Sequence, residues 1–408
     1  MCTQMTDKTI HRMRQLQSLL SLKPLLVLLT SFALISCGGQ QVTSTVVTPL
    51  EHQSIAIDES QLLDLAVLPF DPGLDNEENE EDLALSPAVR NAESQYLANK
   101  LASTIQQTSA WGAVRAVPSR ETVVDVYVEG TIIHSDGEKL SLDISVSDTS
   151  NRHWYTKSYS ETVGQYAYDQ GKQTKRDPFQ GLYNRIANDL LQYRQKLSAT
   201  EAQNLRTISS LKFARDFSPE AFGNHIKETP GGQLEVIRLP AENDPILQRI
   251  ERIRERDYLF IDTMQEHYDA FSLRMERPYQ SWRMATYEEL ASVRELKRQS
   301  RNRTIGGIAA IIAGIAAAGS DNGSVSNAGA VTVVAGGLLV KSGFSKKAEL
   351  KIHEDVLAEL SQSLEAEIEP RVIELENRTI TLTGNVEAQY TQWKALLKEI
   401  YQAERGEI

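Results

Sequence analysis

Between residues 61 and 165, hydrophobic and polar positions follow first the pattern of a buried strand, then that of a helix, and then that of three half-buried strands. The apolar run Leu65–Phe70 predicts the buried strand. Apolar residues at helical spacing from Val89 to Ile105 predict the helix, with Ser86 as N-cap and Pro87 as its first residue. Alternation with a two-residue period predicts the later strands, at Val124–Val128, Leu140–Val146 and His153–Tyr159.

The turn between the first two alternating segments is Ser135-Asp136-Gly137, and Asp-Gly is a strong hairpin signal. Alternation implies one buried and one wet face, so the sheet is expected to be at least partly antiparallel. Residues 61–165 are therefore predicted to form an α+β module, a small antiparallel-containing sheet with a helix packed on one face.

Residues 177–303 are expected to form a mainly helical body. Asp177-Pro178 opens one helix, and a strongly periodic stretch begins at Asp244-Pro245. Pro278 is expected to kink or end that helix, with a second helix from about 286 to 303. We interpret the apolar stripe as a core seam between antiparallel helices rather than a partner surface; it contains Ile250, Ile253, Ile261, Met264, Tyr268, Phe271, Met275, Tyr279 and Trp282.

Charged residues are dense near the start of this stripe. Arg249, Arg252, Arg254 and Arg256 alternate with acidic residues. Mixed charges on a helix usually form a solvated face, which is the prediction here.

Residues 345–408 are predicted to form a helix–strand–helix segment. A charged amphipathic helix, Lys346–Glu369, ends at Pro370. The alternating run Thr379–Gly384 is expected to pair with Val372–Leu375. A last helix carries Tyr390 and Trp393, which fit core packing better than an exposed interface.

The segment 304–344 consists of two apolar arms rich in small residues, joined by a polar turn at 320–324 and flanked by basic residues. Small residues four positions apart let two helix backbones approach closely, but so much glycine makes a poor helix in water. The segment resembles the glycine-zipper segments of outer-envelope proteins. Three interpretations of the segment remain open: a membrane-associated hairpin, an oligomer seam and a buried hairpin. The small residues that repeat every four positions are Gly306, Ala310, Gly314, Ala318, Ala328, Thr332 and Gly336.

The amino-terminal residues 1–36 have the features of a secretory signal. A basic stretch precedes the apolar run Pro24–Ile35, which is too short for a helix of about 20 residues that spans a bilayer. The run ends in Leu34-Ile35-Ser36-Cys37, which resembles the lipobox of bacterial lipoproteins. The resemblance implies cleavage before Cys37 and acylation of that residue, with Met5 and Met13 as alternative starts to Met1.

Charge and cysteine content agree with an exported protein. Residues 1–36 carry four cations and one anion, so their removal takes the formal net charge from −12 to −15, which argues against a nucleic-acid partner. Of the two cysteines, only Cys37 remains after cleavage. Gly38 follows it, and resemblance to the sorting rule of enteric bacteria implies the outer membrane. Residues 38–60 are expected to be a tether between lipid and fold.

No catalytic motif accompanies these features. The seven histidines are not placed at metal-binding spacing, and there is no Gly-x-Ser-x-Gly motif or phosphate-binding loop. The acidic stretch Asp75–Asp82 lacks the ligand spacing of a calcium loop. We therefore expect no enzymatic activity and no cofactor other than the covalent lipid on Cys37.

The motifs "LAVLPF", "DVYVEGTI" followed by "DGEKLSLDISVSD", and "WYTKSY" give residues 61–165 a family resemblance. They resemble the periplasmic module of curli-secretion lipoproteins and of lipoproteins that activate penicillin-binding proteins. The rest of the chain resembles uncharacterised proteobacterial lipoproteins. The resemblance implies a module that binds protein partners or builds rings.

Together these features predict an outer-membrane lipoprotein that faces the periplasm. The expected role is a scaffold or assembly factor that binds other envelope proteins. The alternatives are an oligomeric pore or secretion-ring component that uses 304–344, and an activator of cell-wall synthesis. The expected partners are other envelope proteins and membrane lipid, which is reached through Cys37 and, if the hairpin inserts, through 304–344. A homo-oligomer is a further alternative.

Overall fold

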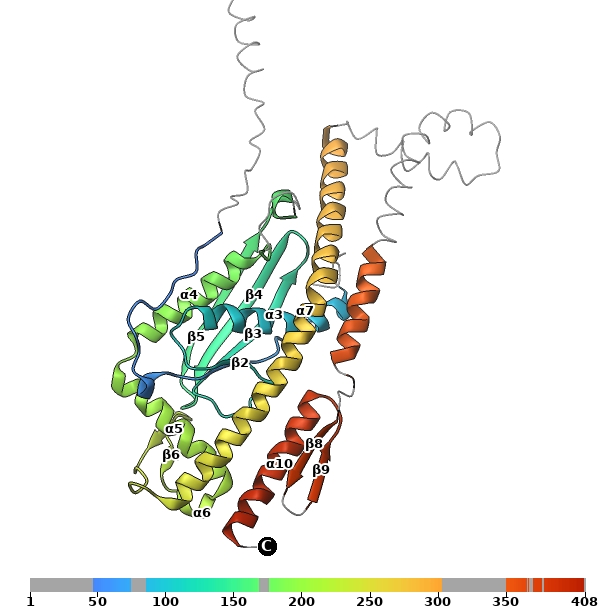
Figure 1. Cartoon of the computed structure of the whole chain (residues 1–408). Coiled ribbons are helices and arrows are strands. Elements are labelled where there is room, and N and C mark those ends of the chain that lie inside the picture. Colours follow the sequence, from blue (N-terminus) through green and yellow to red (C-terminus); the bar gives the residue numbers. More distant parts are fainter. Residues whose placement is uncertain are drawn as a thin grey trace, which may run out of the picture. The chain divides into compact units, whose positions relative to one another are not determined.

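The strands expected between residues 61 and 165 form one five-stranded sheet in the computed structural model (Figure 1). The structure describes residues 47–74, 86–168, 176–302, 350–364, 366, 370–375 and 378–406, all within one compact unit, Thr45–Ile408. The sheet order is β2-β1-β3-β4-β5, where β1 is parallel to β2 and β3, and β3, β4 and β5 are antiparallel. The strands are β1 (Leu65–Val67), β2 (Val114–Ala116), β3 (Val126–Ser135), β4 (Lys139–Asp148) and β5 (His153–Thr162).

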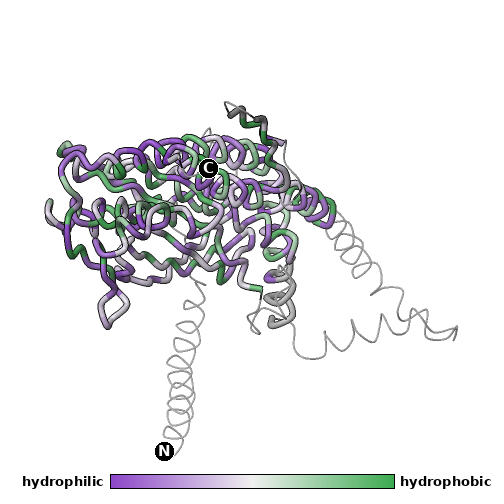
Figure 2. The backbone as a smooth tube through the Cα atoms, turned by 90° about the horizontal axis from the view of Figure 1, so that it is seen from below, coloured by the Kyte–Doolittle hydropathy of each residue, from purple (hydrophilic) through white to green (hydrophobic). Residues whose placement is uncertain are grey.

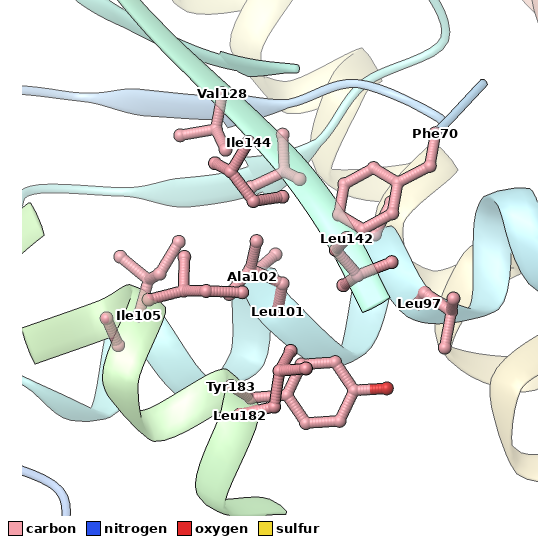
Figure 3. Packing of buried hydrophobic residues seen from close by; sticks show 14 of the residues in the cluster. Phe70, Leu97, Leu101, Ala102, Ile105, Val128, Leu142, Ile144, Leu182 and Tyr183 are labelled. Atoms are coloured by element: carbon pink, nitrogen blue, oxygen red, sulfur yellow. The ribbon is translucent and has the colours of Figure 1, made fainter. Parts of the chain in front are cut away.

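The predicted α+β class is confirmed. The alternating apolar residues of β4, from Leu140 to Val146, are fully buried on one face of the sheet. Two helices cover that face, α3 (Pro87–Gln107) and α4 (Gln180–Lys196). Figure 3 shows Leu101 and Ile105 of α3 packed together with residues from the sheet and from α4. Pro87 is the first residue of α3 as expected, but the Ser86 side chain makes no capping hydrogen bond.

Strand β1 is buried on both faces. Leu65 and Val67 join the core under α3 and α4, whereas Ala66 belongs to a second core. The second core is formed mainly by α5 (Ala199–Phe217), α7 (Pro245–Asn302) and α10 (Val386–Arg405). The remaining short elements are η1 (Glu59–Gln61), η3 (Gln165–Tyr168), α6 (Pro219–Phe222), β6 (Ile226–Glu228) and β7 (Leu234–Val236).

Helix α7 corrects one expectation. Of the kink or end expected at Pro278, the end is wrong: the helix continues through this residue and includes the expected second helix. Proline removes one hydrogen bond of the helix. The neighbouring side chains on the apolar stripe, Met275 and Tyr279, are fully buried, and their packing maintains the helix across this site.

The apolar stripe of α7 lies in the core, as predicted. Figure 2 shows the hydrophobic and hydrophilic stretches that alternate along the backbone. α10 contacts α7, and their pairing is antiparallel: Phe260 stacks on Trp393 with ring centroids 4.8 Å apart, while Arg256 forms an ion pair with Glu404. Tyr390 and Trp393 are buried, in agreement with the core interpretation.

The C-terminal segment has a hairpin before α10. Residues 350–364 are helical, and Leu357 shares a core with Trp282 of α7. The hairpin pairs β8 (Arg371–Leu375) with β9 (Arg378–Leu382) in antiparallel register. This confirms the strand pairing that the alternation in 372–384 predicted.

Candidate functional site

All residues that the sequence singled out for lipid or seam roles lie outside the described residues. They are Cys37 and the small residues Gly306, Ala310, Gly314, Ala318, Ala328, Thr332 and Gly336. The structure describes the residues on either side of them: the fold begins at Val47 after Cys37, and Asn302 and Leu350 flank the small-residue segment. The acidic stretch Asp75–Asp82 also lies outside this part of the chain.

The first described residues are tied to the body. Asn184 Nδ2 on α4 donates to Thr48 O at 2.7 Å. One turn later, Asn188 donates through Nδ2 to Pro49 O at 3.0 Å and accepts at Oδ1 from Glu51 N at 2.8 Å. Both asparagine side chains are buried. We call residues 47–61 the strap; this half of the segment expected to be a tether is bonded along α4.

The strap continues to the far end of α4. Gln53 N donates to Thr108 O at 2.8 Å, and Arg194 Nη2 donates to Gln61 O at 2.6 Å. Leu50 and Ile57 pack partly buried against the first core. The strap is therefore a structural part of the described fold.

A polar groove lies where the end of the strap meets α5 and α7. It encloses about 800 Å³, and a smaller hollow of about 240 Å³ adjoins it. Gln203 Nε2 donates to Ser60 Oγ at 3.1 Å, and Arg206 donates to Glu59 O across one wall. The lining residues of the larger part are Asp58, Glu59, Ser60, Gln203, Arg206, Thr207, Ser210, Glu251 and Arg254.

The inner end of the groove contains a buried charge cluster. Asp125 Oδ2 accepts from Asp64 N at 2.8 Å, and Arg254 Nη2 donates to Ser209 Oγ at 2.5 Å. Burial raises the pKa of the Asp125 carboxyl, and the charge of Arg254 opposes part of that rise. Burial also raises the pKa of Tyr258 to about 12, so its hydroxyl stays protonated at neutral pH.

This cluster departs in part from the solvated face expected on α7, where Arg252 and Arg256 are exposed as expected. Arg254 is half-buried, its guanidinium lies 5.2 Å from the ring centre of Tyr258, and its Nε has no hydrogen-bond partner among the described residues. Asp257 is only 1% exposed. The sequence signal for Asp257 is its position four residues from both Ile253 and Ile261, which places it on the apolar stripe.

A second hollow lies at the tip of the β3–β4 hairpin. It encloses about 370 Å³ and is lined by Gln165, Tyr166, Tyr168, Met284, Tyr287 and Glu288. Tyr168 donates its hydroxyl to Gly137 O at 2.6 Å, and its ring centroid lies 5.7 Å from that of Tyr287. The hollow therefore joins η3, the hairpin tip and α7.

A buried ion pair fixes α7 beneath this hollow. Arg283 Nη1 lies 3.1 Å from both carboxylate oxygens of Asp177, and neither side chain is solvent-exposed to any meaningful extent. The guanidinium also lies 4.0 Å from the ring centre of Tyr279. A Cβ on Gly137 would lie 1.8 Å from Arg283 O, so glycine is needed for this close approach.

The side chains that line these sites can form hydrogen bonds, ion pairs and aromatic contacts. Within the described residues, no group of three or more potential ligands is arranged to hold a metal ion. None of the described helices is long and apolar enough to cross a membrane. Carboxylates and arginines in the groove suit charged groups of a polypeptide, whereas the tyrosines of the second hollow suit apolar or interfacial contacts.

Comparison with protein-family models, with curated proteins and with solved structures finds no match to this chain.

Proposed function

We propose that this protein is a lipoprotein of the outer membrane that faces the periplasm and acts, without enzymatic activity, as a protein-binding scaffold or assembly factor of the cell envelope. One observation carries the proposal: the apolar run Pro24–Ile35 ends directly at the Leu34-Ile35-Ser36-Cys37 motif. Val47, where the described fold begins, stands only ten positions after Cys37.

The strap supports an anchoring role. Ten extended residues span at most about 35 Å, so acyl chains on Cys37 hold the start of the strap within that distance of the lipid. Asn184 and Asn188 then fasten the chain to α4. Two or three acyl chains give stable anchoring, whereas one chain alone is marginal.

The polar groove is the proposed contact surface for a protein partner. Its larger part exposes Asp58, Glu59 and Glu251 beside Arg206. Acidic residues outnumber basic ones here, and the mature chain is strongly acidic overall. A basic segment of a partner fits this surface because opposite charges speed association and set register.

Acylation is tested by metabolic labelling with palmitate. We expect label in the natural chain and in Cys2→Ser, which is the matched control because Cys2 leaves with the signal. We expect no label in Cys37→Ser, and labelling of that variant would overturn the proposal.

Partner binding is tested by placing a photoreactive amino acid at Thr207, which lines the groove, and at Lys398, which is exposed on α10. A discrete adduct in intact cells is expected from position 207 alone. Glu251→Lys reverses a charge in the groove and should abolish the adduct, whereas Glu359→Lys on the 350–364 helix should leave it. Equal adducts from both positions would count against the groove.

The pore or secretion-ring alternative has one structural observation in its favour. α7 ends at Asn302, and the chain is helical again from 350. Leu357 of this later helix shares a core with Trp282 of α7. The segment 304–344 therefore begins and ends on two helices that pack together. Deletion of 304–344 should leave the sedimentation of a scaffold nearly unchanged, whereas a ring should dissociate. An activator of cell-wall synthesis is supported by the resemblance of 61–165 alone.

A further inference from the structure

Three segments of the chain meet at the tip of the β3–β4 hairpin. Tyr168 of η3 bonds to Gly137 at the tip, and the backbone of α7 at Arg283 lies directly against the same glycine. Arg283 pairs with Asp177, whose backbone carbonyl accepts from Gln180 N at the start of α4. One turn later Asn184 holds Thr48 of the strap. Figure 1 shows η3, the start of α4 and the rising end of α7 around this hairpin.

The surface at this tip carries aromatic side chains that reach solvent. Tyr166 is 68% exposed, and it lines the hollow together with Tyr287 and Met284, which are half-buried. Tyrosine is enriched at the interface between lipid and water because its ring is apolar and its hydroxyl is polar.

The adjoining end of α7 is basic. From Arg294 to Asn302, its last turns contain Arg294, Lys297, Arg298 and Arg301 and the single acidic residue Glu295, whereas Glu288 and Glu289 lie nearer the hollow. This contrasts with the acidic charge of the chain as a whole. Clusters of basic residues next to a bilayer are attracted to anionic headgroups, at about 1 kcal/mol for each residue near the surface.

The length of chain before the strap sets the position of this tip. Val47 stands ten positions after Cys37, and the next residue, Thr48, is bonded at the start of α4. Because that chain spans at most about 35 Å, an acylated Cys37 keeps this end of the fold close to the lipid.

We propose that the hairpin-tip end, formed by η3, the β3–β4 turn and the last third of α7, is a second membrane contact, with Tyr166 and Tyr287 at headgroup level and the basic turns of α7 over anionic lipid. The proposal rests on the acylation of Cys37 proposed above. The occupant is the lipid surface that holds the acyl chains. The contact orients the body and leaves the groove, at the other end of α4, facing the periplasm.

The test uses the acylated full-length protein in vesicles of phosphatidylethanolamine and phosphatidylglycerol. The sulfur of Cys37 carries lipid, so a Tyr166→Cys variant has one free thiol for an environment-sensitive fluorophore. Leu239→Cys is the matched control, because Leu239 is 66% exposed and follows β7. β7 is bonded at Leu234 N to Ser150 O, beyond the end of β4 that lies opposite the tip.

Spin-labelled headgroup lipids are expected to quench the fluorophore at 166 several-fold more strongly than the one at 239. The paired change Lys297→Glu with Arg298→Glu should reduce that quenching, and Arg252→Glu, on the exposed first turns of α7, should not. Equal quenching at both positions, or none at 166 in protein shown by mass to be acylated, overturns this inference and leaves the anchor intact. Absence of acylation itself overturns the proposed function instead.

Discussion

Two charged side chains of α7 are buried at positions where they interrupt its apolar stripe. Arg283 follows Trp282 and lies four residues after Tyr279, and Asp257 lies between Ile253 and Ile261. Arg283 is paired with Asp177, which limits the cost of its burial. Asp257 has a weaker set of partners: Tyr390 Oη lies 3.5 Å from Oδ2, while Oδ1 has no hydrogen-bond partner among the described residues.

Asp257 is predicted to make stability depend on pH. Burial raises its pKa from 3.8 to about 6, although Lys394, Trp393 and Arg254 oppose the rise. A raised pKa in the folded state favours folding below pH 3.8, and that contribution is lost as the pH rises through about 6. Asp257→Asn should therefore raise the free energy of unfolding at neutral pH, on the order of 1–3 kcal/mol.

The measurement is urea unfolding of Asp257→Asn at pH 4 and pH 7, with Asp216→Asn on the exposed face of α5 as control. The gain should appear at pH 7 and shrink toward pH 4. A gain of the same size at both pH values contradicts the role of the buried carboxylate.

Gly137→Ala is predicted to destabilise the fold. The added Cβ would lie 1.8 Å from Arg283 O and 2.5 Å from Tyr287 N, both backbone atoms of α7. The resulting displacement should cost about 1–3 kcal/mol. Gly231→Ala is the control, because its Cβ would meet only Thr229 Oγ1 at 3.8 Å. Similar unfolding free energies for the two variants would falsify the close docking of the hairpin on α7.

At the scale of elements, sequence periodicity predicted the helices and strands that depend mainly on residues close together in the chain. The alternation in 124–159 gave β3, β4 and β5, and the apolar period gave α3 and most of α7. Strand β2 was missed because Val114–Ala116 is too short to show a period and pairs with β1 only through long-range contacts. The continuity of α7 was missed because packing on Met275 and Tyr279 outweighs the effect of one proline.

The candidate sites were predictable to a smaller extent. The lipobox is a contiguous motif, so Cys37 was found from sequence and stays a prediction. The groove joins Glu59 to Arg206 and Arg254, which are far apart in the chain. The strap has no period of its own; the asparagines that hold it belong to α4.

Pro278→Ala is predicted to stabilise α7. Alanine restores the backbone donor that proline lacks and removes the clash in the preceding turn. It also makes the unfolded chain more flexible, at a cost of about 0.4–1 kcal/mol. We expect a net gain of about 1–2 kcal/mol in thermal unfolding. Pro245→Ala, at the first residue of α7, should give no gain, because proline is favourable there. A lower free energy of unfolding in Pro278→Ala would show instead that the packing of α7 requires the backbone geometry that Pro278 imposes.

Asn188→Ala is predicted to loosen the strap. It removes the donor to Pro49 O and the acceptor from Glu51 N, at about 1 kcal/mol for each hydrogen bond. Amide hydrogen exchange should become faster at Glu51, with smaller changes elsewhere. Asn204→Ala, on the exposed face of α5, is the control. Unchanged exchange at Glu51 would show that Asn188 does not hold the strap.

At the scale of the molecule, the two cores share elements from most of the described chain. α7 contacts α3, β2, α5 and α10, so residues before 165 and after 245 contribute to both cores. Such a body is expected to move as one piece on its anchor. In the arrangement that we propose, the strap and the hairpin tip determine which surface faces the lipid and which faces the periplasm.

The most direct test of this account is the partitioning of Cys37→Ser between the soluble periplasm and the outer membrane, compared with the natural chain and with Cys37→Ser that also lacks 304–344. We expect the natural chain in the outer membrane. We expect Cys37→Ser to be soluble, folded and unchanged in sedimentation, because the interfacial contact alone is too weak to hold it. If Cys37→Ser stays in the membrane and becomes soluble only when 304–344 is also deleted, the lipid is not the only stable anchor. That result would contradict this account and favour a pore whose hairpin is inserted in the membrane.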